Sequence, residues 1–257
     1  MRRCWFYPAL FLLIYLFPSV AVAEFPPVSN VFIGVLANRS AANCLKRWRP
    51  LADYLDSRVA GSSFHIVQLG FDYINQAVAE KMVDFVLVNP AVYVDLESKY
   101  NVSRALTVIQ SEAGSLNIEF AGVLFCLAKD QTEVHLKDLR GASLAAVDEN
   151  SLAWLALRLE MQDGGLDYRR DLSALTFSAS HDQVVYEVLG GRSQFGIVRT
   201  GVLESMAQEG LIDLMRLKVV HEHGGGDVHL PFAHSTRGYP EWPLAALAHT
   251  DSALVNR

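Results

Sequence analysis

Residues 141–165, GASLAAVDENSLAWLALRLEMQDGG, contain a complete strand-to-helix unit. The apolar run ASLAAV is typical of a buried strand, and SLAWLALRLEMQD repeats apolar residues at helical spacing. Gly164 and Gly165 indicate the end of the helix, because glycine commonly follows a helix C-terminus. Asn150 and Ser151 stand at the junction. They either cap the helix or mark a place where its unpaired N–H groups bind an anion.

The same alternation runs along the whole chain. Strands are predicted at 31–36, 64–71, 83–88, 105–110, 120–129, 142–147, 174–179, 195–198 and 215–220. Helices are predicted at 40–58, 72–82, 89–100, 151–163, 181–189 and 201–210, and the tail 234–250 is predicted as a loop. Strands alternating with helices predict parallel sheets covered on both faces. The length favours two α/β halves of roughly 100 residues each.

The composition is that of a globular protein with an acidic surface. The chain has 257 residues, of which 51% are hydrophobic and 19% charged, and its net charge is −6. No cluster of lysine and arginine is present, so nucleic acid is not an expected partner.

The N-terminus has the pattern of a secretory signal. Met1-Arg2-Arg3 precedes an apolar run over 4–17, and Ala21-Val22-Ala23 provides a cleavage site, so residues 1–23 are predicted as a signal peptide. An uncleaved membrane anchor is the alternative. The predicted location is the periplasm. Cleavage takes the net charge from −6 to −8, so an anionic ligand would need local donors.

Cysteine and histidine give no firm metal or disulfide pattern. Cys44 and Cys126 would face an oxidising compartment, where they either pair or remain buried thiols. Four histidines occur late in the chain: His221, His223, His229 and His234. Their loose spacing is unlike that of a metal site, so neither a metal nor a cofactor is predicted.

Short polar residues stand at most strand-to-helix junctions: Asn38, Ser40, Asp72, Asn89, Asn150, Ser151, Ser180 and Thr200. In open α/β sheets these junctions lie at the ends of the strands where ligands bind. Capping alone explains each residue singly. Together they indicate an oxyanion site made of helix N-termini.

Three further residues or pairs have both a structural and a functional interpretation. His181 follows Ser180 and is either structural or a donor to an anion, and Arg199 either forms a salt bridge or binds an anion in a bidentate manner. Asp148 and Glu149 could act with His181 in an enzyme cleaving a phosphate or sulfur ester. The chain lacks the serine-hydrolase, nucleotide and dinucleotide motifs, which argues against an enzyme.

Several stretches resemble one known family in their order. They are IGVLANRS, WRPLADYL, VDFVLVNPAVYV, AGVLF, DLRGASLAAVDENS, SHDQVVYEVLGG, GIVRT and STRGYPEWPLA. The order is similar to that of phosphate/phosphonate-type periplasmic substrate-binding proteins. Within that family it most resembles the input domains of sensor histidine kinases, including tetrathionate-type sensors.

This resemblance implies a type II periplasmic-binding-protein fold, with two α/β lobes, two crossovers and a ligand cleft. Lobe 1 is expected to comprise residues 24–118 and 219–257, and lobe 2 residues 119–218. The implied ligand-binding residues are Asn38, Arg39, Tyr73, Asn89, Asn150, Ser151, Ser180, His181, Arg199, Thr200, Ser235 and Thr236. The chain departs from the family at Leu152, Ala153 and Trp154, where small residues are usual, and at Gln194, where an aspartate is usual.

The sequence therefore predicts an exported, non-enzymatic domain that binds a small oxyanion, such as phosphonate, phosphate or a sulfur oxyanion. The expected partner is a membrane sensor kinase. The alternative is the binding component of an ABC transporter, with a permease as partner.

Overall fold

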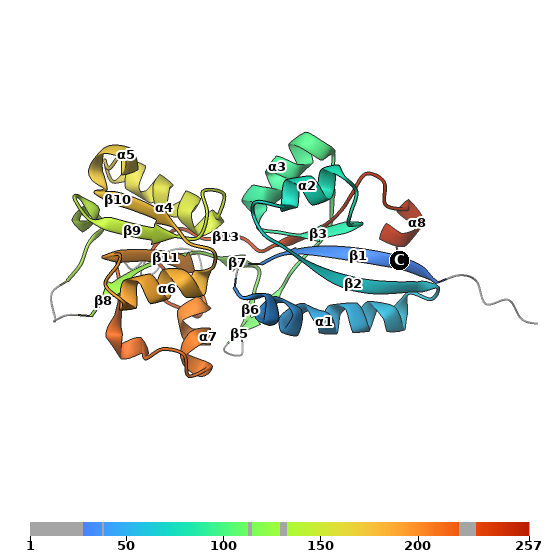
Figure 1. Cartoon of the computed structure of the whole chain (residues 1–257), viewed down its shortest axis with the longest axis horizontal. Coiled ribbons are helices and arrows are strands. Elements are labelled where there is room, and N and C mark those ends of the chain that lie inside the picture. The colour runs from blue at the N-terminus through green and yellow to red at the C-terminus, as the bar shows by residue number, and fades with distance from the viewer. Residues whose placement is uncertain (1–27, 38, 113–114, 129–132, 221–229, 257) are drawn as a thin grey trace, which may run out of the picture.

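Two α/β lobes lie side by side in the computed structural model (Figure 1). It describes residues 28–37, 39–112, 115–128, 133–220 and 230–256, so the predicted signal peptide lies outside the described residues. No helix in these ranges is long and apolar enough to cross a membrane.

The first lobe is built on a five-stranded sheet. Its strands, in spatial order, are β2 (Ser62–Leu69), β1 (Ser29–Leu36), β3 (Phe85–Leu87), β14 (Pro243–Ala246) and β4 (Ser103–Thr107). Helices α2 (Ile74–Ala79) and α3 (Pro90–Tyr100) lie on one side of the sheet, and α1 (Ala41–Arg58) lies on the other (Figure 1). Pro50 lies inside α1, well past its first turn.

The second lobe has a sheet of the same size. Its strands, in spatial order, are β10 (Ala174–Phe177), β9 (Ser143–Ala146), β11 (Phe195–Arg199), β8 (Gly122–Leu127) and β12 (Leu217–Val219). Helices α4 (Leu152–Asp163) and α5 (Tyr168–Asp171) cover one face, and α6 (His181–Leu189) and α7 (Val202–Gln208) cover the other (Figure 1).

Each sheet is mixed, which corrects the prediction of parallel sheets. Strand β14 runs antiparallel between β3 and β4, and β8 runs antiparallel between β11 and β12. The helices connect only the parallel strands. The antiparallel strand in each sheet is contributed by a segment that enters from the other lobe or from the C-terminal tail.

The prediction of a loop over 234–250 was wrong at β14. The strand reads Pro-Leu-Ala-Ala, which has weak intrinsic β propensity. Leu244 nevertheless pairs with Leu87 on one side and Leu106 on the other. Pairing with β3 on one side and β4 on the other therefore imposes the strand conformation on Pro243–Ala246.

Alternation along β8 explains how the second sheet is covered on both faces. Leu124 and Cys126 contact the cluster that includes Trp154 of α4, whereas Val123 and Phe125 contact the cluster that includes α6 and α7. Successive strand residues point to opposite faces, so one apolar run supplies both cores.

The two lobes are joined by crossing segments. Strand β7 (Glu119–Phe120) pairs antiparallel with β13 (Tyr239–Pro240), and both lie between the lobes (Figure 1). The predicted strand 105–110 is divided between β4 and β5 (Gln110–Glu112), and β5 forms a hairpin with β6 (Ser115–Asn117). Short 3₁₀ helices lie at Leu136–Leu139 and Leu214–Arg216, and α8 (Ser252–Val255) ends the described chain.

The second sheet extends slightly past residue 218. Val219 pairs with Phe125, and the Val220 N–H donates to the Leu124 carbonyl at 2.8 Å. The Ser235 N–H also donates to the Gly122 carbonyl at 2.8 Å. Val220 and Ser235, which stand on either side of residues 221–229, are therefore both bonded to β8.

Candidate functional site

Four helices begin at polar residues that the sequence had marked. The side-chain oxygen of each accepts a backbone N–H of the first turn: Ser40 (α1, 3.3 Å), Asn89 (α3, 2.9 Å), Ser151 (α4, 3.4 Å) and Ser180 (α6, 3.3 Å). Pro90 follows Asn89, as predicted for a helix start. The capping interpretation is confirmed for these residues.

Two other predicted junction residues do not cap a helix. Tyr73, not Asp72, precedes α2, because Gly70 accepts the N–H groups of both Tyr73 and Ile74 and so places Asp72 inside a turn. Gly201, not Thr200, precedes α7 and has a φ of 82°, which glycine adopts without strain.

Contacts between the lobes set the helix N-termini opposite one another. The Asn89 side chain, before α3, donates to the carbonyl of Asn150, before α4, at 3.4 Å. Arg39, before α1, contacts Asp182 in the first turn of α6, with Nε 2.6 Å from Oδ1. The four N-termini thus form two facing pairs along the boundary between the lobes.

His181 is the most strongly perturbed group at this boundary. Its side chain is 5% exposed, and its Nδ1 atom has no hydrogen-bond partner. Burial, with the positive charges of Arg199 and Arg39, lowers the pKa of His181 to about 3. The imidazole is therefore neutral at physiological pH.

Ser178 is a candidate that the sequence reasoning missed. Its hydroxyl is buried, without a hydrogen-bond partner, two residues before the α6 cap. A buried unpaired hydroxyl has a free-energy cost, so such an atom needs an explanation. Its place in the predicted strand 174–179 gave no signal of this kind, because only burial distinguishes such a serine from a solvated one.

Arg199 lies where the crossing segments meet the second sheet. Its guanidinium group forms a buried ion pair with Glu241. It also stacks on Phe120, with the guanidinium carbon 4.4 Å from the ring centre, and lies 5.9 Å from that of Trp242. The salt-bridge interpretation of Arg199 is therefore realised here, although in a buried position, and its charge still acts on His181.

Three predicted ligand residues instead bond to the backbone around β8. Thr200 Oγ1 accepts the Ala121 N–H at 3.2 Å, and Thr236 Oγ1 accepts the Gly122 N–H at 2.8 Å. Ser235 Oγ accepts the Leu124 N–H at 2.9 Å and donates to the Val220 carbonyl at 2.6 Å. In this structure their hydroxyl groups fasten the crossing segments to the second sheet.

Replacing Ser235 with alanine is expected to lower the free energy of unfolding by about 1–3 kcal/mol, because it leaves the buried Leu124 N–H and Val220 carbonyl unpaired. Urea unfolding followed by circular dichroism measures the change. Ser57→Ala is the matched control, since Ser57 is exposed and donates only to Tyr54. Equal losses in the two variants would contradict this role of Ser235.

The remaining predicted residues are dispersed. Asn38 lies outside the described residues, and the Tyr73 hydroxyl donates to Met82 Sδ at 3.0 Å within the first lobe. Asn150 is exposed, and Asp148 Oδ1 accepts its N–H at 2.8 Å. Asp148 therefore holds the turn before α4.

Only some of the residues considered for a metal site or a disulfide lie within the described ranges. His221, His223 and His229 lie outside the described residues, and His234 Nδ1 lies 3.2 Å from the Phe232 carbonyl. Within the described ranges, no three histidine, cysteine or acidic residues gather as a metal site would require. Cys44 and Cys126 are both buried thiols.

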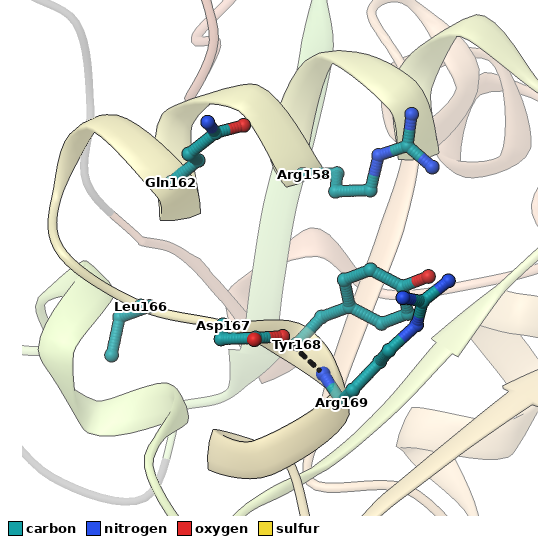
Figure 2. A pocket seen from close by; sticks show the side chains of 6 residues that line it. All are labelled: Arg158, Gln162, Leu166, Asp167, Tyr168 and Arg169. Atoms are coloured by element: carbon teal, nitrogen blue, oxygen red, sulfur yellow. Dashed lines mark hydrogen bonds between the residues drawn. The ribbon is translucent and has the colours of Figure 1, made fainter.

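A separate pocket of about 420 Å³ lies on the second lobe, between α4 and the segment leading into α5 (Figure 2). It is lined by Arg158, Gln162, Leu166, Asp167, Tyr168 and Arg169, and none of them was predicted as a ligand residue. Asp167 Oδ1 accepts the Arg169 N–H at 3.0 Å and so caps α5. All the residues that line this pocket belong to the second lobe.

Comparison with known proteins gives a family match over most of the chain. The model of the family described as "ABC transporter, phosphonate, periplasmic substrate-binding protein" matches residues 33–257. The tetrathionate sensor histidine kinase TtrS of Salmonella typhimurium is 30% identical over 226 residues, which are 88% of this chain and 38% of TtrS. The chain therefore spans well under half the length of that relative.

Solved structures share the fold at low sequence identity. PhnD1 from Prochlorococcus marinus, in complex with methylphosphonate, has a TM-score of 0.70 and 17% identity, covering 89% of this chain and 79% of PhnD1. A binding protein component of an ABC phosphonate transporter from Pseudomonas aeruginosa has a TM-score of 0.69 and 14% identity, covering 89% and 72%.

These neighbours, together with the two sheets and crossing segments, confirm the expected type II periplasmic-binding-protein fold. The family and the fold are those of solute-binding proteins and not of enzymes. By its sequence over residues 33–257, the chain belongs to the family of phosphonate-type periplasmic substrate-binding proteins.

Proposed function

We propose that this chain is an exported domain that binds a small oxyanion between its two lobes, at the N-terminus of α6. The predicted signal peptide, residues 1–23, directs it to the periplasm. Lobe 1 comprises residues 24–118 and 219–257 and lobe 2 residues 119–218, apart from the short extension at β12. Binding brings the lobes together and reports the presence of the ligand.

One observation carries this proposal: two buried polar atoms at the start of α6 have no partner. They are His181 Nδ1 and Ser178 Oγ. A folded protein keeps such atoms unsatisfied at a cost, which a bound ligand removes. Both lie at the end of a helix whose first N–H groups and dipole favour negative charge.

The imidazole of His181 is suited to donating a hydrogen bond to an anion. Burial, with the charges of Arg199 and Arg39, lowers the pKa of His181, so its imidazole is neutral. A neutral imidazole with Nδ1 protonated donates a hydrogen bond without adding a full charge. The acidic net charge of −6 is no obstacle, since the donors are local.

Sensing is the role that the relatives favour. Identity to TtrS, named a tetrathionate sensor histidine kinase, is 30%, whereas it is 14–17% to the phosphonate-binding structures. We therefore place tetrathionate and related sulfur oxyanions first among the ligands and a membrane sensor kinase first among the partners. The family match keeps transport of phosphonate through an ABC permease as the second candidate.

Calorimetric titration with tetrathionate, sulfate, inorganic phosphate and methylphosphonate tests the ligand class. Ser178→Ala and His181→Phe are each expected to weaken binding of the best anion by about tenfold or more, since each removes one donor. Both should leave the ligand-free protein equally stable or more so, because the deleted atoms have no partner in it. Unchanged affinity in both variants would reject the α6 site.

A further inference from the structure

Arg39 and three residues of the second lobe form a charged cluster across the boundary between the lobes. Arg39 follows β1 of the first lobe, Asp182 lies in α6, and Ser205 and Glu209 lie in and directly after α7. The side chains of Arg39 and Asp182 are only 10% and 15% exposed, and that of Glu209 is 36% exposed. This cluster is called the Arg39 latch below.

Every N–H of the Arg39 guanidinium group has a protein acceptor. Nε and Nη2 donate to the two oxygens of Asp182 at 2.6 and 3.1 Å. Nη1 and Nη2 donate to the two oxygens of Glu209 at 2.8 Å each, and Nη1 also donates to Ser205 Oγ at 3.2 Å. These five contacts account for the five N–H donors that arginine has.

The contacts within the Arg39 latch favour the charged forms of Arg39 and Glu209. Burial opposes ionisation of Arg39, but the hydrogen bonds that it donates to Glu209 and Asp182 raise its pKa above the ordinary value. The same contact with Arg39 lowers the pKa of Glu209. Arg39 and Glu209 are therefore charged at neutral pH, and bidentate pairs of this kind are the stronger hydrogen bonds in proteins.

We propose that Arg39 holds the two lobes closed in the absence of ligand and does not itself bind the anion. An anion that bound Arg39 directly would have to displace one of two carboxylates that each make two contacts with it. The latch thus sets the ratio of closed to open protein before ligand binds, and a ligand bound at α6 raises that ratio further. The effect on ligand affinity rests on the proposed function, whereas closure itself does not.

Distance measurement between spin labels in anion-free, low-salt buffer tests closure directly. Labels are attached through Val94→Cys on α3 and Met215→Cys in the second lobe, which are 60% and 85% exposed. Arg39→Ala is expected to shift the distances to longer values and to lower the closed-to-open ratio about tenfold, after allowance for partial solvent screening. Asp182→Asn combined with Glu209→Gln should open the lobes in the same way.

Arg170→Ala is the matched control. Arg170 also makes a two-point contact with a carboxylate, that of Asp171, but entirely within α5. It should leave the distances unchanged. Identical distances in wild type and Arg39→Ala overturn the latch, whatever the ligand proves to be.

Titration of the unlabelled variants with inorganic phosphate, methylphosphonate and tetrathionate separates the latch from the proposed site. If no anion binds the wild type while Arg39→Ala still opens the lobes, the latch stands and the oxyanion function fails. If Arg39→Ala abolishes binding without changing the ligand-free distances, Arg39 is a ligand contact and the latch is wrong.

Discussion

Replacing Arg199 with alanine is expected to lower the free energy of unfolding by about 3–5 kcal/mol, the largest effect of any single change proposed for this protein. Arg199 forms an ion pair with Glu241, whose side chain is 1% exposed. Its removal breaks this buried ion pair and deletes the guanidinium group that lies over the Phe120 and Trp242 rings. Urea unfolding at pH 7.5 measures the loss.

A double replacement tests whether the loss of stability comes from leaving one buried charge unpaired or from losing the ion pair as such. Arg199→Met combined with Glu241→Leu removes both charges and keeps much of the volume, so it should recover most of the lost stability. Arg170→Ala, which removes a largely exposed arginine from its pair with Asp171, should cost much less than Arg199→Ala. A similarly small loss in Arg199→Ala would mean that the crossing segments do not depend on this ion pair.

The second large effect is a dependence of stability on pH that arises from His181. Its pKa is lowered from 6.5 to about 3 in the folded chain, mainly by burial. Between these values the unfolded chain binds the proton and the folded chain does not, so the free energy of unfolding falls as the pH falls. The linkage relation gives a loss of about 2 kcal/mol between pH 7.5 and pH 5.

Unfolding in urea at a series of pH values tests this relation in wild type and His181→Phe. The variant has no imidazole to protonate at this position, so its stability should fall less over the same interval by about 2 kcal/mol. His65→Phe, which removes an exposed histidine, serves as the control. Parallel pH curves for wild type and His181→Phe would show that His181 is not held neutral by the fold.

Ser178 and Ser235 show why stability and binding should separate in this molecule. Ser235 has its hydroxyl fully used by the backbone of β8 and by Val220, so its loss should affect stability. Ser178 has a buried hydroxyl without a partner, so its loss should affect binding. The sequence placed Ser178 in the predicted strand 174–179 and Ser235 in the predicted loop 234–250, and only their contacts distinguish the two roles.

Local patterns predicted most of the helices and strands, because their causes lie within a few residues. Apolar periodicity identified α4 and α6, and the caps at Asn89, Ser151 and Ser180 are local hydrogen bonds to the following turn. The prediction of a loop over 234–250 failed because the cause of β14 lies far away in the sequence. Strand β14 has weak propensity of its own and forms only because β3 and β4 offer their edges.

Candidate site residues were predicted less completely than the elements that carry them. The sequence placed Ser180 and His181 at a helix start, and the structure shows that start facing the other lobe. It also grouped Arg39, Arg199, Ser235 and Thr236 as ligand residues by resemblance. In the folded chain their polar groups contact Asp182, Glu241 and backbone atoms, which are 42 to 143 residues away for the two arginines.

The sequence by itself determined the alternation of strands and helices and the caps at Ser40, Asn89, Ser151 and Ser180, because periodicity and capping depend on neighbouring residues. The order of its motifs also carried the resemblance to a two-lobed binding fold. Only the tertiary structure decided which charges are paired, which hydroxyls are satisfied and which polar atoms are left open. Those outcomes depend on which distant segments meet, and burial then converts a common serine or histidine into an unsatisfied donor. The difference between the Arg39 latch and the α6 site therefore arises from the packing of the two lobes.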